Sequence, residues 1–198
     1  MKRAVFLDRD GVLLEEGAYV HRVADAVILP GVPAALRRLH DADFLLFIVT
    51  NQSGIGRGYY TLADMHAVNR WLAEEVGRAG ARFHEVYFAP EAPEQPSRGR
   101  KPSPQFLFDA RDEFGVDLGE SFMVGDKLTD LECGWNGGVK HSLLVRTGYG
   151  AETERKEPAK VARAVVVDDL PAAAEWILSR PAVVPSLRDD AIGGSPGR

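Results

Sequence analysis

The 198-residue sequence is poor in cysteine and has no long hydrophobic run. Cys133 is the single cysteine, which excludes an intrachain disulfide and a cysteine-rich zinc site. No segment reaches the roughly 18 apolar residues of a membrane span. The basic residues 1–3 precede an apolar run that already ends at Asp8, which is too short for a signal peptide. We therefore expect a cytoplasmic protein without a membrane partner.

An excess of positive charge is also missing. The chain has 24 lysine and arginine residues against 29 acidic ones, a formal net charge of −5, which argues against nucleic acid as the main partner. Its 45% hydrophobic and 27% charged residues are typical of a globular protein, and its length suits one domain. We expect a monomer with one domain over residues 1–179. Residues 180–198, where Pro, Gly and Ser occur without periodicity, are predicted to be a disordered tail.

Apolar runs alternate with helical patterns along the rest of the chain. Strands are predicted at residues 4–7, 44–49, 85–89, 121–124, 142–145 and 164–167, and helices at residues 32–40, 61–80, 104–114, 131–137 and 170–178. This alternation predicts an α/β fold with a doubly wound, mostly parallel Rossmann-like sheet. Ligands of such sheets bind beyond the carboxyl ends of the strands, so the residues that follow each strand are the candidates for function.

Two carboxylates, Asp8 and Asp10, follow the first predicted strand. Side chains two residues apart on an extended chain lie on one face, and Gly11 allows the chain to turn beside them. Close carboxylates repel each other unless a cation lies between them, and Mg²⁺ prefers such oxygen ligands. Asp8 is then placed to attack phosphorus, and Asp10 to protonate the leaving oxygen and later activate water. The alternative for an isolated pair of this kind is a capped turn after an edge strand.

Polar residues follow other predicted strands too. Residues 50–58 combine hydroxyl, amide and glycine, a composition that suits either an anion-binding turn or an ordinary capped loop. Asp126 and Lys127 follow the fourth strand, in the same layout of strand and carboxylate as Asp8. Because the carboxyl ends of parallel strands meet at one edge of a sheet, we expect these residues to form a single site.

The order of these residues resembles the four motifs of the haloacid dehalogenase superfamily of phosphohydrolases. The matching stretches are Asp8-x-Asp10, Thr50, Lys101 and Gly125-Asp126-x-x-x-Asp130. The resemblance implies a phosphatase with Asp8 as the nucleophile and Asp10 as the general acid/base. It also implies that Thr50 and Lys101 hold the phosphoryl oxygens.

The resemblance further implies a cofactor and a substrate class. Mg²⁺ would be held by Asp8, the main-chain carbonyl of Asp10 and Asp126, with Asp130 as a supporting carboxylate. Within the superfamily, the chain resembles the branch of the D-glycero-D-manno-heptose 1,7-bisphosphate phosphatases and their neighbours, the histidinol-phosphate phosphatases. This branch implies a small sugar phosphate as the substrate, bound by Glu16, Tyr19, Asn51, Gln52, Ser53, Arg100 and Lys127.

The resemblance leaves more than one substrate open. Removal of the C7 phosphate of a heptose 1,7-bisphosphate is favoured, because Arg100 and Lys127 suit a doubly charged substrate. Histidinol phosphate is the alternative substrate. A non-catalytic phosphate-binding protein on the same fold is a different class of function, but every catalytic position holds the residue type that catalysis needs.

One feature of this branch is missing from the chain. Its members usually carry a zinc loop of three cysteines and one histidine before the catalytic lysine, whereas residues 88–100 contain neither. We therefore predict no structural zinc. No insertion long enough for a cap domain precedes Lys101, so we expect a minimal cap and an open site with Tyr19 and His21 near its rim. The other four histidines are expected to have no role, and Cys133 is expected to be a small core residue.

Overall fold

A six-stranded, all-parallel sheet forms the centre of the structure, a computed structural model that describes residues 2–180. The strands are β1 (Ala4–Leu7), β2 (Leu45–Asn51), β3 (Glu85–Ala89), β4 (Phe122–Gly125), β5 (His141–Val145) and β6 (Val165–Val167), in the order β3-β2-β1-β4-β5-β6. Because β1 lies between β2 and β4, Leu7 has Ile48 and Val124 as its neighbours. The predicted α/β fold with a parallel sheet is confirmed.

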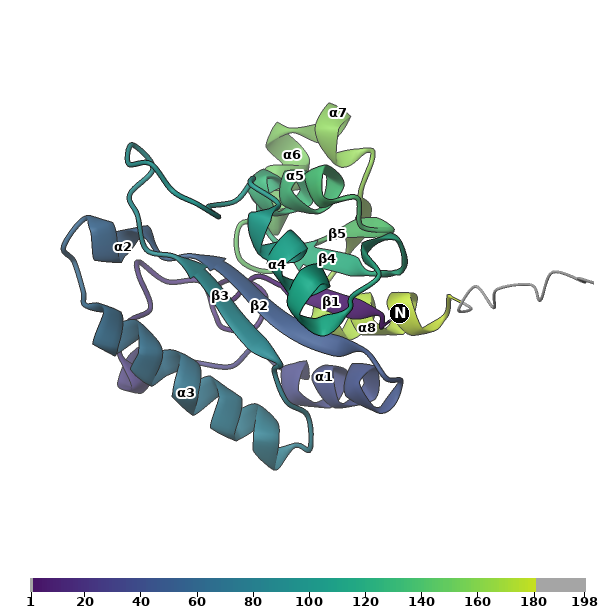
Figure 1. Cartoon of the computed structure of the whole chain (residues 1–198), viewed down its shortest axis with the longest axis horizontal. Coiled ribbons are helices and arrows are strands. Elements are labelled where there is room, and N and C mark those ends of the chain that lie inside the picture. The colour runs from purple at the N-terminus through teal and green to yellow at the C-terminus, as the bar shows by residue number, and fades with distance from the viewer. Residues whose placement is uncertain (1, 181–198) are drawn as a thin grey trace, which may run out of the picture.

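Helices cover both faces of the sheet, as a doubly wound fold requires (Figure 1). One face packs on α1 (Val32–Asp41), α3 (Leu62–Arg78) and α8 (Leu170–Leu178), and the other on α4 (Gln105–Phe114) and α5 (Leu128–Gly137). Successive strand residues point to opposite faces. In β1, Val5 and Leu7 therefore join the first core, while Ala4 and Phe6 join the second. This burial on both sides explains why the strands are continuously apolar.

The sequence pattern misses five short elements. These are α2 (Ser53–Gly56), α6 (Gly150–Lys156), α7 (Pro158–Val161) and the 3₁₀ turns η1 (Val23–Asp25) and η2 (Leu118–Glu120). Elements of three to seven residues are too short to show a 3.6-residue period. Helix α5 also begins at Leu128, three residues before the predicted start, because Asp130 at its N3 position accepts hydrogen bonds from the main chain of Asp126 and Lys127.

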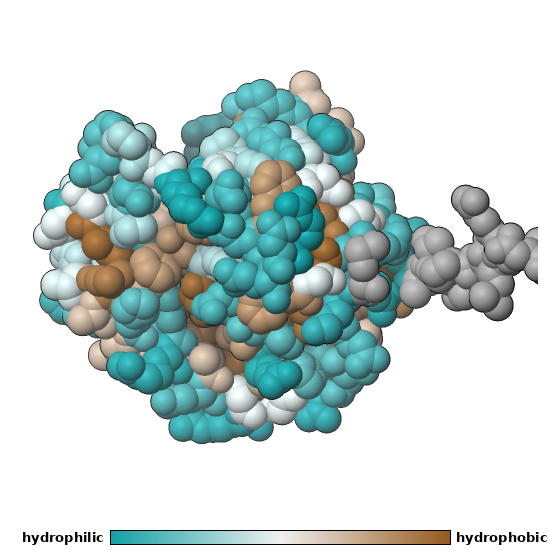
Figure 2. All heavy atoms as spheres, viewed as in Figure 1, coloured by the Kyte–Doolittle hydropathy of each residue, from teal (hydrophilic) through white to brown (hydrophobic). Residues whose placement is uncertain are grey.

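The molecular surface over this view is mostly hydrophilic, with smaller hydrophobic patches (Figure 2). Within residues 2–180, no helix has both the length and the apolar character that crossing a membrane requires. The predicted disordered tail, residues 180–198, lies outside the described residues except for Arg180.

Candidate active site

A cleft of about 370 Å³ lies at the carboxyl ends of β1 and β2. Its wall contains eleven of the residues named from the sequence: Asp8, Asp10, Glu16, Tyr19, Thr50, Asn51, Gln52, Ser53, Lys101, Lys127 and Asp130. Tyr60, Thr129 and Tyr149 also line the cleft. Two residues named from the sequence do not: Asp126, which is fully buried, and Arg100.

Asp8 lies one residue beyond β1 and is 5% exposed. Its Oδ1 accepts a hydrogen bond from the main-chain N–H of Arg9 at 2.8 Å and lies 2.8 Å from Lys101 Nζ. Burial by itself raises the pKa of the Asp8 carboxyl, but the charges of Lys101 and Lys127 outweigh it and lower the pKa below its usual value. Both contacts use Oδ1, so Oδ2 is left for an electrophile or a metal.

Lys101 reaches Asp8 from the loop that follows β3. Its side chain is buried, lies 2.7 Å from Asp130 Oδ1 and donates a hydrogen bond of 2.7 Å to the Val49 carbonyl. Burial opposes the charge of Lys101, but Asp130 and Asp8 outweigh burial and raise its pKa, so the side chain stays cationic. The Asn51 amide holds the Lys101 main chain, because it donates to the carbonyl at 3.1 Å and accepts from the N–H at 3.0 Å.

Asp8, Asp126 and Asp130 form a cluster whose carboxylate oxygens lie within 4.8 Å of one another. Asp126 Oδ2 accepts a hydrogen bond of 2.8 Å from the main-chain N–H of Tyr149, but Oδ1 is buried without a hydrogen-bond partner among residues 2–180. Burial, Asp130 and Asp8 together raise the pKa of Asp126 to about 8. A divalent cation supplies the partner that Oδ1 lacks, so the donor set fits Mg²⁺.

The charge of the site also fits a divalent cation. Five carboxylates meet three cationic side chains there: Asp8, Asp10, Glu16, Asp126 and Asp130 against Arg9, Lys101 and Lys127. When all eight groups are ionised, this leaves a formal charge of −2, which one Mg²⁺ neutralises. A phosphate dianion approaches Asp8 more easily once this charge is neutralised.

Two glycines make room for the Asp126 carboxylate. Gly11 has φ +85° and Gly148 has φ +58°, and a Cβ on either would overlap Asp126. The hydroxyl of Thr147 donates a hydrogen bond of 2.6 Å to the Gly11 carbonyl. The turns after β1 and β5 are therefore joined beside the carboxylates that could hold a metal ion.

Arg9 is the main residue of the site that the sequence analysis missed. It is fully buried, and its Nε and Nη2 lie 3.0–3.2 Å from both oxygens of the Asp10 carboxylate. The Asp10 carboxylate is accordingly not part of the metal cluster, and a metal contact through the Asp10 carbonyl stays a prediction. The signal that could have found Arg9 is its place between two functional carboxylates, directly after a buried strand.

Gln52 connects Asp10 to Thr50. Its Nε2 donates to Asp10 Oδ2 and to Thr50 Oγ1, both at 2.9 Å, and its Oε1 accepts from the Tyr60 hydroxyl at 2.7 Å. Thr50 is 1% exposed and accepts the Gln52 hydrogen bond, so its own hydroxyl proton remains available to a phosphoryl oxygen. The side chains of Gln52 and Asn51 therefore hold other residues of the site in place. Contact between their main chain and a substrate, as expected from the sequence, stays a prediction.

The rim of the cleft combines charged and aromatic side chains. Lys127 Nζ lies 3.0 Å from Glu16 Oε2 and 4.7 Å from the centre of the Tyr149 ring. Tyr19, at 39% exposure, packs edge-on against Tyr59 with ring centres 5.0 Å apart. Its positive φ of 64° turns the chain at this point. This rim offers a polar and aromatic surface to the organic part of a ligand.

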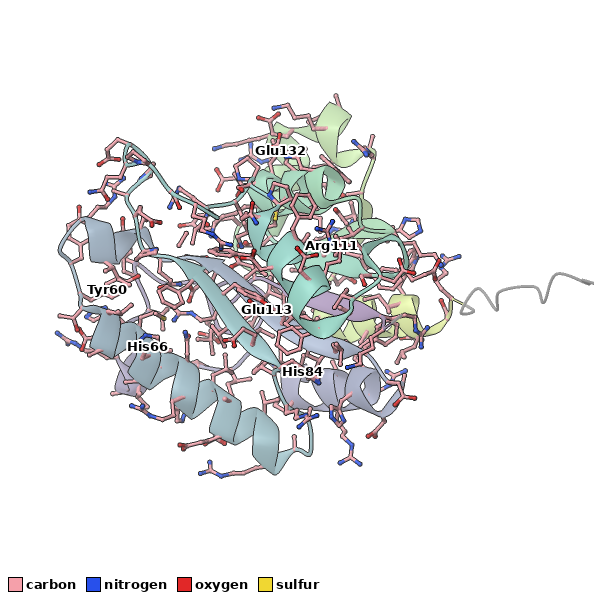
Figure 3. All side chains as sticks on the ribbon, in the orientation of Figure 1. Tyr60, His66, His84, Arg111, Glu113 and Glu132 are labelled. Atoms are coloured by element: carbon pink, nitrogen blue, oxygen red, sulfur yellow. The ribbon has the colours of Figure 1, made fainter. Side chains whose placement is uncertain are left out.

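His21 and the aromatic side chains extend the rim toward α3. The His21 ring stacks on Tyr60 at 5.2 Å, and its Nδ1 lies 2.7 Å from the Tyr19 carbonyl. Figure 3 shows Tyr60 at the start of α3, and His84 at the far end of that helix and of β3. Of the histidines in residues 2–180, none lines the cleft.

Cys133 is fully buried and burial raises its pKa to about 12, so it is a core residue as predicted.

Arg100 points into its own loop. Its Nη1 donates a hydrogen bond of 3.1 Å to the Glu91 carbonyl. Ser97 Oγ joins the same two residues, since it donates to Glu91 Oε2 at 2.7 Å and accepts from Arg100 N at 3.1 Å. These bonds connect the two ends of the segment that carries a zinc loop in the branch that this chain resembles. A contact between Arg100 and a second phosphate remains a prediction.

Comparison with known proteins gives matches in sequence. The HAD-hydrolase-like family model matches residues 99–173. A protein of Thermosynechococcus vestitus named D-glycero-D-manno-heptose-1,7-bisphosphate 7-phosphatase is 39% identical, over 88% of this chain and 94% of its own length. A protein of Escherichia coli K12 named D-glycero-beta-D-manno-heptose-1,7-bisphosphate 7-phosphatase is 33% identical, over 92% of this chain and 91% of its own.

Solved structures agree with the sequence matches. The D,D-heptose 1,7-bisphosphate phosphatase of B. bronchiseptica, crystallised with magnesium and phosphate, superposes with a TM-score of 0.82 at 32% identity. The superposition covers 90% of this chain and 98% of that one. The corresponding enzyme of Burkholderia thailandensis gives a TM-score of 0.68 at 30% identity, over 90% and 100% of the two chains.

Proposed function

This chain belongs to the heptose-bisphosphate phosphatase family of HAD-like hydrolases, and from that premise we propose that it removes the C7 phosphate of a D-glycero-D-manno-heptose 1,7-bisphosphate with Mg²⁺ as cofactor. The observation that carries the proposal is the cluster of Asp8, Asp126 and Asp130 beside Lys101. It combines a nucleophile, an unpartnered carboxylate oxygen for a metal and a fixed cation in one cleft. A protein that only binds phosphate needs no such nucleophile.

In the first step, Asp8 Oδ2 attacks the phosphorus atom and forms an aspartyl-phosphate. The bond between phosphorus and the sugar oxygen breaks, and Asp10 gives its proton to that oxygen as it leaves. Lys101 and Thr50 line the same cleft, where the Thr50 hydroxyl would donate to an equatorial oxygen and the Lys101 cation would help neutralise the charge that these oxygens carry in the transition state. Mg²⁺, held by Asp8 and Asp126, would add a Lewis acid to this charge neutralisation.

In the second step, Asp10 acts as the base. It takes a proton from a water molecule, whose oxygen attacks phosphorus and displaces the Asp8 carboxylate. Inorganic phosphate leaves, Asp8 is free again, and Asp10 has regained the proton that the next cycle needs. Asp10 must therefore face first the sugar oxygen and then the water from the same side of the cleft.

The rim supports a small polyhydroxylated substrate. Glu16 offers a carboxylate to sugar hydroxyls, Lys127 offers a cation to a second phosphate, and the exposed ring of Tyr19 offers an apolar face. The names of relatives divide between the α and the β anomer. Both anomers are therefore candidate substrates.

The test is phosphate release in the presence of Mg²⁺ from both anomers of the heptose bisphosphate and from histidinol phosphate, measured side by side. We expect a preference for a heptose bisphosphate. The variant Asp8→Asn is the control, and loss of the nucleophile is expected to lower kcat by about 10⁴-fold or more. Its folding is checked by circular dichroism.

Each alternative outcome contradicts a different part of the proposal. A preference for histidinol phosphate would keep the chemistry and overturn the substrate. Phosphate release by wild-type protein no faster than by Asp8→Asn, from all three compounds, would overturn both.

A further inference from the structure

We propose that Arg9 is the positioning residue of Asp10: its buried guanidinium holds the general acid/base in one orientation and ties it to the rim of the cleft. The inference rests on the proposed function, because the orientation of Asp10 matters only if the chain hydrolyses phosphate esters. It concerns how proton transfer is arranged in a phosphatase without a cap domain.

The contacts of Arg9 use all three of its nitrogens. Nε and Nη2 bind both oxygens of Asp10 at 3.0–3.2 Å, and Nη2 also reaches Gln52 Oε1 at 3.1 Å and the Val20 carbonyl at 2.8 Å. Nη1 donates to Asn69 Oδ1 at 3.0 Å. One side chain thus joins Asp10 after β1, Gln52 after β2, the rim at Val20 and helix α3 at Asn69.

Burial makes this arrangement restrictive. A buried charge is costly unless it is paired, and Asp10 is the carboxylate with which Arg9 forms an ion pair. If Asp10 rotated away, Nε of the buried guanidinium would lose both of its hydrogen-bond acceptors, whether or not Asp10 carries a proton. The Asp10 side chain nevertheless keeps 17% of its surface exposed and lines the cleft. Arg9 therefore fixes the plane of the carboxylate while leaving part of it open to the reacting oxygen.

Stability alone does not explain a buried arginine here. Apolar residues of similar volume often stabilise a protein as well as a buried ion pair does. Arginine is distinguished by a planar fork that can bind both oxygens of one carboxylate at once. Lysine keeps the charge but offers its donors from a single nitrogen, so Arg9→Lys removes the fork and retains the cation.

The proposal predicts a loss that depends on the leaving group. A sugar oxygen must receive a proton as it leaves, whereas p-nitrophenolate leaves without one. The parameter kcat/KM reports the steps through formation of the aspartyl-phosphate, in which Asp10 acts as the acid. We expect Arg9→Lys to lower kcat/KM for the heptose bisphosphate at least about tenfold more than kcat/KM for p-nitrophenyl phosphate, since general acid catalysis contributes roughly 10²–10⁴-fold.

The experiment measures both substrates at saturating Mg²⁺ with wild type, Arg9→Lys and Asn69→Leu. Asn69→Leu keeps Arg9 and removes only the hydrogen-bond partner of Nη1. Its loss of kcat/KM should be smaller than that of Arg9→Lys, and it should again be larger for the heptose bisphosphate than for p-nitrophenyl phosphate. Val68→Ala is the matched control, because Val68 is buried in the core from the same helix. It should lower stability without changing the ratio of the two kcat/KM values.

Equal losses on both substrates would overturn the positioning role. If Arg9→Lys does not fold, Asn69→Leu decides: a selective loss supports the inference, and no loss or a uniform loss contradicts it. Failure of the wild type to hydrolyse either substrate faster than Asp8→Asn would instead be a failure of the proposed function.

Discussion

The charge of Asp126 is only partly compensated by the protein itself. Its carboxylate is fully buried, one oxygen lacks a hydrogen-bond partner among residues 2–180, and Asp130 and Asp8 lie nearby. Such a group destabilises the fold unless a cation or a proton neutralises it. The oxygen that destabilises the fold in this way is also the strongest candidate for a metal ligand.

The variant Asp126→Asn tests this balance. In the presence of EDTA, we expect it to be about 1–3 kcal/mol more stable than wild type, because it removes an incompletely paired buried carboxylate. Its amide oxygen can still accept the Tyr149 hydrogen bond. Phosphatase activity should fall close to that of Asp8→Asn. Urea unfolding in EDTA measures the stability, and a variant less stable than wild type would contradict this account of Asp126.

Helix α3 shows how an element remote from the chemistry supports it. Thr61 is its N-cap and forms a capping box with Asp64. The helix presents Val68, Leu72 and Val76 to the core. The same helix carries Asn69 to Arg9.

Loss of the cap should affect stability and leave catalysis intact. We expect Thr61→Ala to destabilise the protein by about 1 kcal/mol, which lowers Tm by about 2–4 °C for a chain of this size. Calorimetry measures the shift, and Thr61→Ser, which retains a capping oxygen, is the matched control. A fall in kcat/KM larger than twofold would show that the start of α3 acts on the site directly.

The loop between β3 and α4 is the element in which this chain departs from the branch it resembles. Hydrogen bonds among Glu91, Ser97 and Arg100 hold it, and Arg98 pairs with Asp109 of α4. We predict that purified protein carries no structural zinc, measured by atomic absorption. One zinc per chain would contradict this prediction.

The hydroxyl of Ser97 should contribute to the stability of the same loop. We expect Ser97→Ala to lower the free energy of unfolding by about 1 kcal/mol, since two hydrogen bonds depend on that hydroxyl.

The molecule as a whole should respond to Mg²⁺ as to a stabilising ligand. The proposed metal ligands Asp8 and Asp126 directly follow β1 and β4, which are neighbours at the centre of the sheet. A cation that binds them binds only the folded chain, and at about 100 times its Kd it adds about 2.7 kcal/mol to the free energy of unfolding. We expect Tm to rise with added MgCl₂ and to fall again with EDTA. KCl of equal ionic strength should not reproduce the rise, and neither should MgCl₂ added to Asp126→Asn.

The sequence alone determined the fold class and the edge of the sheet that carries the site. Strands buried on both faces are continuous apolar runs, and in a parallel sheet their carboxyl ends must lie together, so Asp8, Thr50 and Asp126 could be grouped before any coordinates were known. The capped start of α3 was predictable for a similar reason, because a capping box depends only on residues three positions apart.

Only the tertiary structure decided what several of these side chains contact. Asn51 and Gln52 both line the cleft, and the sequence could not show that one side chain holds the main chain of Lys101 and that the other joins Asp10 to Thr50. Arg9, to which the sequence analysis assigned no role, is fully buried in the fold. The physical reason is that side-chain hydrogen bonds join segments far apart in the chain, and the spacing of residues along one strand or helix does not contain those distances.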